Sequence, residues 1–181
     1  KTAQQLLEQD QAYPCFCPPD ETKAQQAKAR EKGNVWRDES CRERAADKAC
    51  VRIAAGESHS LRFRVPHRGQ IIFEDQVYGR VELDSRNLED FTLLRSDGSP
   101  TYHLSVVTDD RDMAISHVIR GVDHLSNTHK HILVHEALGG QPPIHAHLPL
   151  ILGPDKKRLS KRHGATSVLK YREQGVLPRA L

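Results

Sequence analysis

The chain has 181 residues, of which 37% are apolar and 28% are charged, and its formal net charge is +3. This length allows one large domain or two small ones with a real core, and the composition excludes disordered and collagen-like classes. No apolar run reaches 18 residues, and no basic flank leads into an apolar segment at the beginning, so we expect neither a membrane span nor a signal peptide. The chain begins with Lys1, and its single Met lies at position 113, so we interpret it as a piece of a longer protein.

The first 50 residues are expected to contain polar helices. Residues 1–11 resemble the end of a helix, and a Pro-Pro pair then interrupts regular structure. Asp20 can cap a helix that Gly33 should end, and residues 41–50 have a second short helical pattern. Because the helix after Asp20 has few apolar residues, we expect it to cover a core rather than fill one.

Strand patterns follow. Residues 61–65 and 76–83 alternate apolar and polar side chains, which predicts half-buried strands. The segment 91–104 is predicted as a further strand, turned by SDGSP at 96–100.

After residue 100 the apolar residues come in runs. Residues 113–121 form a short apolar run, 129–140 a helix that ends on two glycines, and 145–152 a buried strand. Asn127 and Thr128 are expected to cap that helix. Two strands in which apolar and polar residues do not alternate, joined by a helix, predict an α/β fold with a parallel sheet covered on both faces. Residues 167–175 are predicted to be a last helix.

Basic residues concentrate in the segment 153–164, GPDKKRLSKRHG, where five basic residues stand against one acidic residue. Such a run is commonly a solvated surface segment. The alternative is a contact with a polyanion, since flanking Pro and Gly indicate a loop that can close over phosphate. The segment also leaves the carboxyl end of a strand, where ligands of open α/β sheets bind.

Nine of the eleven histidines lie between His103 and His163. His131 and His135 would share a helix face, and His145 and His147 a strand face. No HExxH motif, cysteine or carboxylate stands at ligand spacing in this half, so we favour core or amphipathic surface histidines over a metal site.

Four cysteines lie in the first half, at positions 15, 17, 41 and 50. In a cytosolic chain, free buried thiols or a metal site are more plausible uses than disulfides. Cys15, Cys17 and Cys41 can take three positions around a structural zinc ion. The fourth ligand stays open among Glu43, Cys50, Tyr13 and water.

Three segments, LLRSDGSPTYHLSVVTDD, VIRGVDHLSNT and AHLPLILGPDKKRLSKRHGATSVLKYREQGVLP, resemble the bacterial glutamyl-tRNA synthetases, which are class I aminoacyl-tRNA synthetases. AYPCFC and the region up to Cys41 resemble the acceptor-binding insertion of that family, with its zinc knuckle. The most specific piece is RLSKRHG, which matches the mobile Lys-x-Ser-Lys loop of the family except that Arg158 replaces the first Lys.

The resemblance implies a fold and a division of the chain. The fold would be the second half of a class I, Rossmann-like catalytic domain with an α/β acceptor-binding insertion. Residues 1–98 would be the acceptor-stem-binding insertion, 99–165 the half-domain, and 166–181 the start of a stem-contact helical region. The first half of the nucleotide-binding fold, with its HIGH-type histidines, and the anticodon-binding region are not in this sequence. We therefore expect the fragment alone to be inactive.

The implied reaction is ATP-dependent activation of glutamate, with Mg²⁺, followed by transfer to tRNA(Glu). Lys161 would stabilise the charge that develops on the phosphate, while Ser160 and Arg158 hold the loop and the triphosphate. Asp123 and His124 resemble the adenosine-side segment of the family.

Tyr102 and Arg120, which we expect at or near strand ends, would line the glutamate pocket, since Arg suits a planar carboxylate. Without the resemblance they are a packed aromatic and a surface arginine. The zinc ligands implied are Cys15, Cys17 and Cys41, with Glu43 at the position where the family has a histidine.

Two rivals remain at this point. One is a glutamyl-queuosine tRNA synthetase, which lacks the SKRHG form of the loop. The other is a non-catalytic module that grips the acceptor end of tRNA with its basic residues. In each case we expect a cytoplasmic monomer without membrane contact, whose partner is tRNA.

Overall fold

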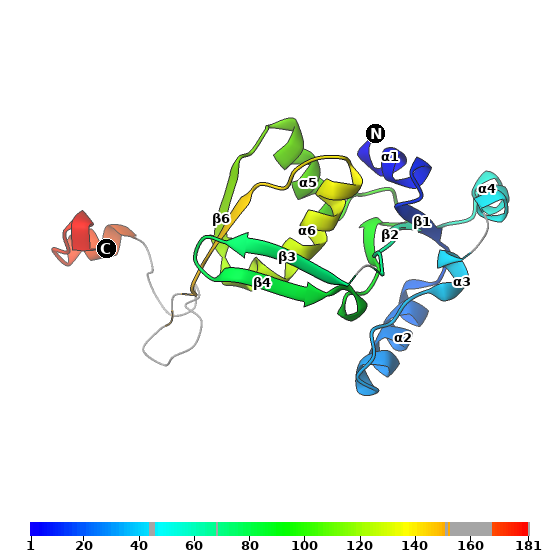
Figure 1. The fold of residues 1–181 in the computed structure, drawn as a ribbon, viewed down its shortest axis with the longest axis horizontal. Helices are drawn as coiled ribbons and strands as arrows, with labels where there is room; N and C mark the ends of the chain where they lie inside the picture. The colour runs from blue at the N-terminus through cyan, green and yellow to red at the C-terminus, as the bar shows by residue number, and fades with distance from the viewer. Residues whose placement is uncertain (44–45, 68, 151, 153–167, 181) are drawn as a thin grey trace.

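The structure is a computed structural model that describes residues 1–43, 46–67, 69–150, 152 and 168–180 (Figure 1). The α-helices of this part are α1 (Thr2–Glu8), α2 (Pro19–Glu31), α3 (Glu39–Arg42), α4 (Ala46–Ala54), α5 (Tyr102–Asp112), α6 (Leu125–Ala137) and α7 (Val168–Glu173). The strands are β1 (Ala12–Cys15), β2 (Ser60–Phe63), β3 (Gln70–Asp75), β4 (Gly79–Asp84), β5 (Phe91–Leu94), β6 (His117–Gly121) and β7 (Ile144–Leu148). Short 3₁₀ turns are η1 (Ser85–Asn87), η2 (Val122–His124) and η4 (Pro178–Ala180). Each helix in these ranges is too short or too polar to cross a bilayer.

The strands form two sheets. The first is antiparallel, with the order β1-β2-β5. The second has the order β4-β3-β7-β6, in which β6 and β7 are parallel and α6 connects them. The β3–β4 hairpin joins β7 through the register pair Asp75 and His145, and Figure 1 shows it lying across α6. The predicted parallel pair around a helix is therefore confirmed. The expected cover on both faces is wrong for the described residues, because Ile119, Ile144 and Leu148 are exposed on these strands.

One hydrophobic core serves both sheets. It contains Phe63 and Leu93 of the first sheet, Ile71 of the second, and Leu133 and Val134 of α6, each at most 3% exposed. The hairpin that precedes residue 98 belongs to the same sheet as β6 and β7, which follow it. The division of the chain at residue 98 stays a prediction. Residues before and after position 98 pack into the same hydrophobic core.

The expected strand over 91–104 is wrong in its second half. The strand ends at Leu94, a turn with Gly98 at φ +81° follows, and Tyr102 begins α5. Tyr102 therefore lies at the beginning of a helix and not at a strand end. The physical reason is the turn, which redirects the chain, after which Pro100 and Thr101 lead into the helix.

The structure differs from the predicted elements in three further places. β1 contains Pro14, which argues against a central strand, but β1 is an edge strand and tolerates the missing N–H. β3 is a strand that we did not predict. α6 begins at Leu125, so Asn127 and Thr128 lie in its first turn and do not cap it.

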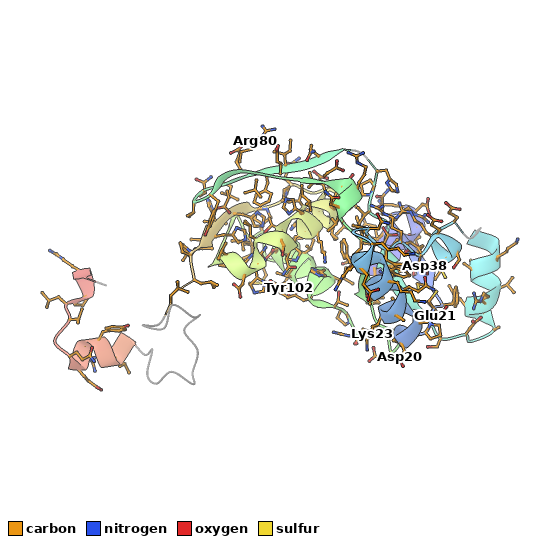
Figure 2. The ribbon with its side chains drawn as sticks, turned by 90° about the horizontal axis from the view of Figure 1, so that it is seen from below. Asp20, Glu21, Lys23, Asp38, Arg80 and Tyr102 are labelled. Atoms are coloured by element: carbon orange, nitrogen blue, oxygen red, sulfur yellow. The ribbon has the colours of Figure 1, made fainter. Side chains whose placement is uncertain are left out.

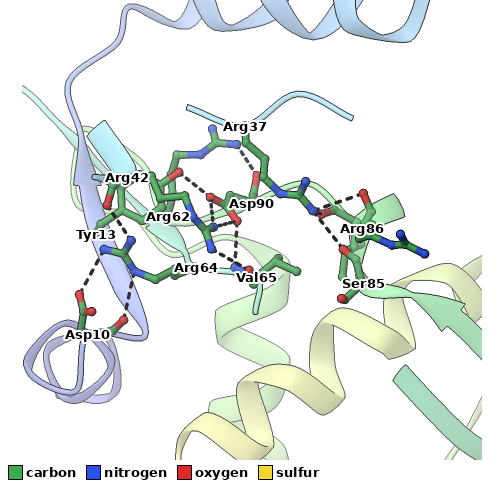
Figure 3. A network of polar contacts seen from close by, with 11 residues as sticks. Asp10, Tyr13, Arg37, Arg42, Arg62, Arg64, Val65, Ser85, Arg86 and Asp90 are labelled. Carbon is green, nitrogen blue, oxygen red and sulfur yellow. Dashed lines mark hydrogen bonds and ion pairs between the residues drawn. The ribbon is translucent and has the colours of Figure 1, made fainter. Parts of the chain in front are cut away.

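Asp90 is the centre of a buried polar network between β1, α3, β2 and β5 (Figure 3). Its carboxylate accepts hydrogen bonds from Tyr13 Oη at 2.9 Å, from Arg42 Nη1 at 2.5 and 2.6 Å, and from the backbone N–H of Val65 at 2.8 Å. Arg62 donates to the backbone carbonyl of Asp90. Asp90 is fully buried, so its charge is balanced by Arg42 inside the protein.

Candidate functional site

Arg120 is the penultimate residue of β6, at the carboxyl end of the parallel pair. Side chains at this edge meet, because parallel strands end there together, and ligands of open α/β sheets bind at such edges. Its Nε donates to His147 Nε2 at 3.1 Å, and its Nη2 donates to Thr128 Oγ1 at 2.6 Å and to the carbonyl of His124 at 3.3 Å. Two edges of the guanidinium are thus held by the protein.

The remaining edge of Arg120 faces Tyr102. Nη1 lies 3.2 Å from Tyr102 Oη and 3.4 Å from His131 Nδ1. Tyr102 is 46% exposed, whereas His131 is 2% exposed. Figure 2 shows Tyr102 on the opposite side of the molecule from Arg80 of the hairpin. The Nη1 edge therefore lies beside an exposed side chain, and a ligand that binds there replaces its contacts with Tyr102 or His131.

His124 and Asp123 lie on η2, directly after β6. The ring of His124 lies 5.5 Å from the ring of Tyr102, and its Nδ1 is 3.2 Å from Asn127 Nδ2. Asp123 is exposed, and its Oδ1 would lie 2.5 Å from a Cβ at position 121. The carboxylate of Asp123 therefore lies against Gly121, and a Cβ at that position would require this exposed side chain to move.

Neutral imidazoles surround Arg120. Burial, and then the charge of Arg120, lower the pKa of His131 to about 2, and burial followed by Lys130 lowers that of His103 to about 4. His131 Nε2 lies 3.2 Å from His103 Nδ1. Because these rings are uncharged at neutral pH, they orient the guanidinium without neutralising it. The arrangement can hold the carboxylate of a ligand against Arg120.

A buried carboxylate lies behind this site. Asp75 Oδ2 is 2.5 Å from His147 Nδ1, and both side chains are fully buried. Burial alone would raise the pKa of Asp75, but hydrogen bonds from His147 and from the backbone N–H groups of Tyr78 and Val77 outweigh it and lower the pKa to about 2. Asp75 is therefore ionised at neutral pH.

The structure brings together three of the predicted residues, Tyr102, Arg120 and His124, with Asp123 on the same turn. Sequence reasoning missed Asp75 and His131 as parts of this site, considered His147 only as one of a histidine pair, and considered Thr128 only as a helix cap. No local pattern marks Asp75, which is 72 residues from His147. Arg158, Ser160 and Lys161 lie outside the described residues.

A second site is formed by Cys15, Cys17, Asp38 and Cys41, whose ligand atoms all lie within 4.8 Å of one another. Cys17 Sγ is 3.9 Å from Cys41 Sγ, close to the ~3.8 Å that two thiolates span on a tetrahedral zinc ion. Asp38 Oδ2 is 2.9 Å from Cys15 Sγ and 3.2 Å from Cys17 Sγ. Figure 2 shows Asp38 well apart from Tyr102, so the two sites are distinct.

The thiols of this cluster resist joint ionisation. Sharing a hydrogen with Cys41, together with burial, raises the pKa of Cys15, and burial and then Asp38 raise that of Cys17 to about 12. The hydrogen bond with Cys15 lowers the pKa of Cys41 to about 6. A divalent cation would remove this repulsion, since three thiols and a carboxylate are a donor set that suits zinc.

Glu43 does not join this cluster, which corrects its expected place as the fourth ligand. It is the exposed residue that ends α3, two positions after Cys41, and residues two apart on a helix point to different faces. Asp38 takes that place as the residue before α3, where its Oδ1 accepts the backbone N–H of Cys41 at 3.2 Å. An Asp three positions before a Cys at a helix start is a capping pattern that could have indicated it.

Comparison with known proteins decides the family. The whole chain, residues 1–181, matches the family model of the tRNA synthetases class I (E and Q), catalytic domain. The chain belongs to this family. Its α/β architecture and the resemblance of its motifs to class I synthetases are thereby confirmed.

Relatives of this class I synthetase chain are curated glutamate–tRNA ligases. It is 51% identical over 179 residues to the "Glutamate--tRNA ligase 2" of Koribacter versatilis and 48% identical over 177 residues to the "Glutamate--tRNA ligase" of Aquifex aeolicus. These alignments cover 98% and 97% of this chain but 37% of each relative. The chain thus spans little more than a third of their length.

Solved structures agree with this assignment. A crystal structure of a glutamate tRNA ligase from Elizabethkingia meningosepticum, in complex with its amino acid, superposes with a TM-score of 0.79 at 30% identity. The superposition covers 94% of this chain and 39% of the Elizabethkingia chain. A glutamate-tRNA synthetase from Elizabethkingia anophelis gives 0.78 at the same identity.

Proposed function

We propose that this chain is the part of a glutamate–tRNA ligase that selects glutamate and contacts the acceptor end of tRNA. The observation that carries the proposal is Arg120, a cation held on two edges by the protein and turned with its third edge toward exposed Tyr102. Family membership and the names of the relatives support the choice of glutamate among carboxylate ligands.

In this proposal Arg120 binds the side-chain carboxylate of glutamate through Nη1, beside the hydroxyl of Tyr102. Charge-assisted hydrogen bonds of this kind are about twice as strong as neutral ones and favour a planar carboxylate. Glutamine presents an uncharged amide and would leave part of the charge of Arg120 unpaired. The pocket therefore prefers glutamate.

The reaction requires ATP with Mg²⁺. An oxygen of the α-carboxylate attacks the α-phosphorus, the bond to the bridging oxygen breaks, and pyrophosphate leaves. Lys161 stabilises the charge on the phosphate oxygens, Ser160 and Arg158 hold the triphosphate, and Asp123 and His124 contact the adenosine side. A ribose hydroxyl at the end of tRNA then attacks the activated carbonyl and releases AMP.

A matched pair of variants tests the role of the basic segment. Lys161→Ala in the full-length protein should lower the maximal rate of ATP–pyrophosphate exchange, measured with tRNA present, about 10²-fold to 10³-fold. The KM for glutamate should change little, because Lys161 acts on the phosphate. Equal losses in rate and in glutamate binding would contradict this role. A protein that binds tRNA with strong salt dependence but catalyses no exchange would be the non-catalytic module instead.

We also propose that Cys15, Cys17, Asp38 and Cys41 hold a structural zinc ion in the acceptor-binding region, residues 1–98. Zinc would tie the β1 knuckle to α3 and stabilise the fold there. Metal analysis of the purified protein should find one zinc ion per chain, lost in Asp38→Ala and kept in the matched variant Glu43→Ala. Zinc below about a tenth of stoichiometry in the unaltered protein would refute the site.

A further inference from the structure

Asp75 and Arg120 are linked through one histidine. His147 lies between them on β7, with Nδ1 2.5 Å from Asp75 Oδ2 and Nε2 3.1 Å from Arg120 Nε. Asp75 comes from the end of β3, and Arg120 comes from β6 on the other side of β7. Three adjacent strands thus each supply one member of a line of hydrogen bonds.

The chemistry of arginine fixes the protonation of His147. A guanidinium has five N–H donors and no acceptor, so His147 Nε2 must accept from Arg120 Nε with its lone pair. The ring then carries its hydrogen on Nδ1 and donates it to Asp75 Oδ2. The opposite tautomer could donate to Thr128 Oγ1, 3.1 Å from Nε2, but it would place two N–H groups against each other at Arg120 and two acceptors against each other at Asp75.

The carboxylate of Asp75 is held in one orientation. Its Oδ1 accepts the backbone N–H groups of Val77 and Tyr78, each at 3.0 Å, and of His147 at 3.2 Å. Three donors on one oxygen leave Oδ2 for the imidazole alone. The turn of the hairpin, Asp75 and the ring of His147 are therefore fixed relative to one another.

We propose that Asp75 is a positioning residue for substrate binding: through His147 it holds the Nε edge of Arg120, so that the Nη1 edge stays turned toward Tyr102 and the ligand. This inference rests on the proposed function, in which Arg120 binds the carboxylate of glutamate. Asp75 does not touch the ligand in this account. It acts by selecting the tautomer that Arg120 requires.

The isosteric variant Asp75→Asn isolates this effect. The amide oxygen of Asn must face the three backbone N–H groups, so its NH₂ group faces His147 Nδ1. The ring then has to accept at Nδ1 and carries its hydrogen on Nε2, where it can donate to Thr128 Oγ1, 3.1 Å away, but opposes Arg120 Nε–H. We expect Arg120 to leave its place, because an acceptor has become a donor.

Two readouts are measured on the full-length protein. Selective ¹⁵N labelling of histidine, with His147 assigned from its absence in His147→Gln, should give the Nδ1–H tautomer in the unaltered protein and the Nε2–H tautomer in Asp75→Asn. In ATP–pyrophosphate exchange with tRNA present, Asp75→Asn should raise the KM for glutamate about tenfold to hundredfold and leave the KM for ATP within about twofold. A structural role alone would move both constants together.

Asp84→Asn is the matched control. Asp84 belongs to the same hairpin and caps a turn with its carboxylate, but it contacts Arg86 and not the Arg120 site. Both KM values should be unchanged in this variant. Should Asp75→Asn fail to fold, the tautomer of the unaltered protein still decides, because an Nε2–H or doubly protonated His147 overturns the proposal.

The outcomes separate this inference from the proposed function. No glutamate-dependent exchange in the unaltered protein would refute the function, while the tautomer change in Asp75→Asn would still support the link from Asp75 to Arg120. Normal exchange with an unchanged glutamate KM in Asp75→Asn would overturn the inference and leave the function standing.

Discussion

Asp90 and Asp75 are both buried carboxylates associated with an arginine, but they use that arginine differently. Asp90 binds Arg42 directly through both oxygens, and Tyr13 and Val65 complete its hydrogen bonds. Asp75 reaches Arg120 only through His147. The first arrangement neutralises the charge of the arginine, whereas in the second no carboxylate contacts the guanidinium and its Nη1 lies beside exposed Tyr102.

This difference separates a structural ion pair from a binding site. Arg42 is 11% exposed and its charge is paired with the buried carboxylate of Asp90, so it carries no unbalanced charge for an anionic ligand. Arg120 is held in place by uncharged partners, Thr128, His131 and His147, and keeps its charge available. A buried arginine whose hydrogen-bond partners are neutral is therefore the better candidate for recognising an anion.

The largest expected effect is on stability at Asp90. Asp90→Ala leaves the charge of Arg42 buried without its partner and should lower the free energy of unfolding by about 3–5 kcal/mol, measured by denaturant titration. The neighbouring variant Glu89→Ala removes a half-buried carboxylate that contacts exposed Arg30 and Gln26, and should change the free energy of unfolding by about 1 kcal/mol. Similar losses in the two variants would contradict a structural role specific to Asp90.

Arg120 should affect binding instead. Arg120→Ala removes the cation and should raise the KM for glutamate about hundredfold or more, since charged hydrogen bonds contribute about 1.5–3 kcal/mol each. The control Arg111→Ala removes an arginine that donates to the carbonyl of Leu138, outside the site. Exchange kinetics in the full-length protein measure both. An unchanged glutamate KM in Arg120→Ala would contradict the proposed pocket.

Tyr102 should have a smaller effect. Tyr102→Phe keeps the ring beside His124 but removes the hydroxyl that lies 3.2 Å from Arg120 Nη1. The hydroxyl accepts from a charged guanidinium, and one hydrogen bond to a charged group is worth about 1.5–3 kcal/mol, so the KM for glutamate should rise about tenfold to hundredfold. A larger loss than in Arg120→Ala would mean that Tyr102, and not the arginine, is the main contact.

The smallest effect at neutral pH is expected at His135. Both ring nitrogens are buried without a hydrogen-bond partner in the described part of the chain, and burial, followed by Arg111, lowers the pKa to about 4. As the pH falls, His135 takes up a proton in the unfolded chain near pH 6.5 but in the folded protein only near pH 4. The stability that neutral His135 gives the folded state is therefore complete above pH 6.5 and is lost as the pH falls toward 4.

The variant His135→Leu removes this titration. At pH 7 its free energy of unfolding should be within about 1 kcal/mol of that of the unaltered protein. Between pH 6.5 and 4 the variant should lose less stability than the unaltered protein, by on the order of 2 kcal/mol. Denaturant titrations across that range measure the difference. Parallel pH profiles in the two proteins would contradict the assignment.

Local patterns in the sequence predicted the parts of this molecule that depend on local structure. The apolar runs around residues 113–121 and 145–152 indicated the parallel pair β6 and β7, although β7 in fact alternates, with His145 and His147 buried and Ile144 and Leu148 exposed. The positions of Arg120 at a strand end and of the CFC knuckle also follow from neighbouring residues. The choice of glutamate came from the resemblance of motifs and not from the pattern.

The remaining parts depend on contacts between distant segments. Asp75 lies in a strand that was not predicted, and its partner His147 is 72 residues away, so no spacing could join them. Tyr102 was placed at a strand end because the SDGSP turn was read as lying within a strand. Asp38 replaced Glu43 near the thiols because helix geometry, and not chain distance, decides which side chain faces Cys41.

The most direct test of the central claim is aminoacylation by the full-length protein. Purified protein is incubated with ATP, Mg²⁺, bulk bacterial tRNA and radiolabelled glutamate, and acid-precipitable label is counted, with Arg120→Ala and radiolabelled glutamine as comparisons. We expect ATP-dependent attachment of glutamate to tRNA that is much weaker in Arg120→Ala and with glutamine. Absence of attachment by the unaltered protein, or equal attachment by Arg120→Ala, would contradict it.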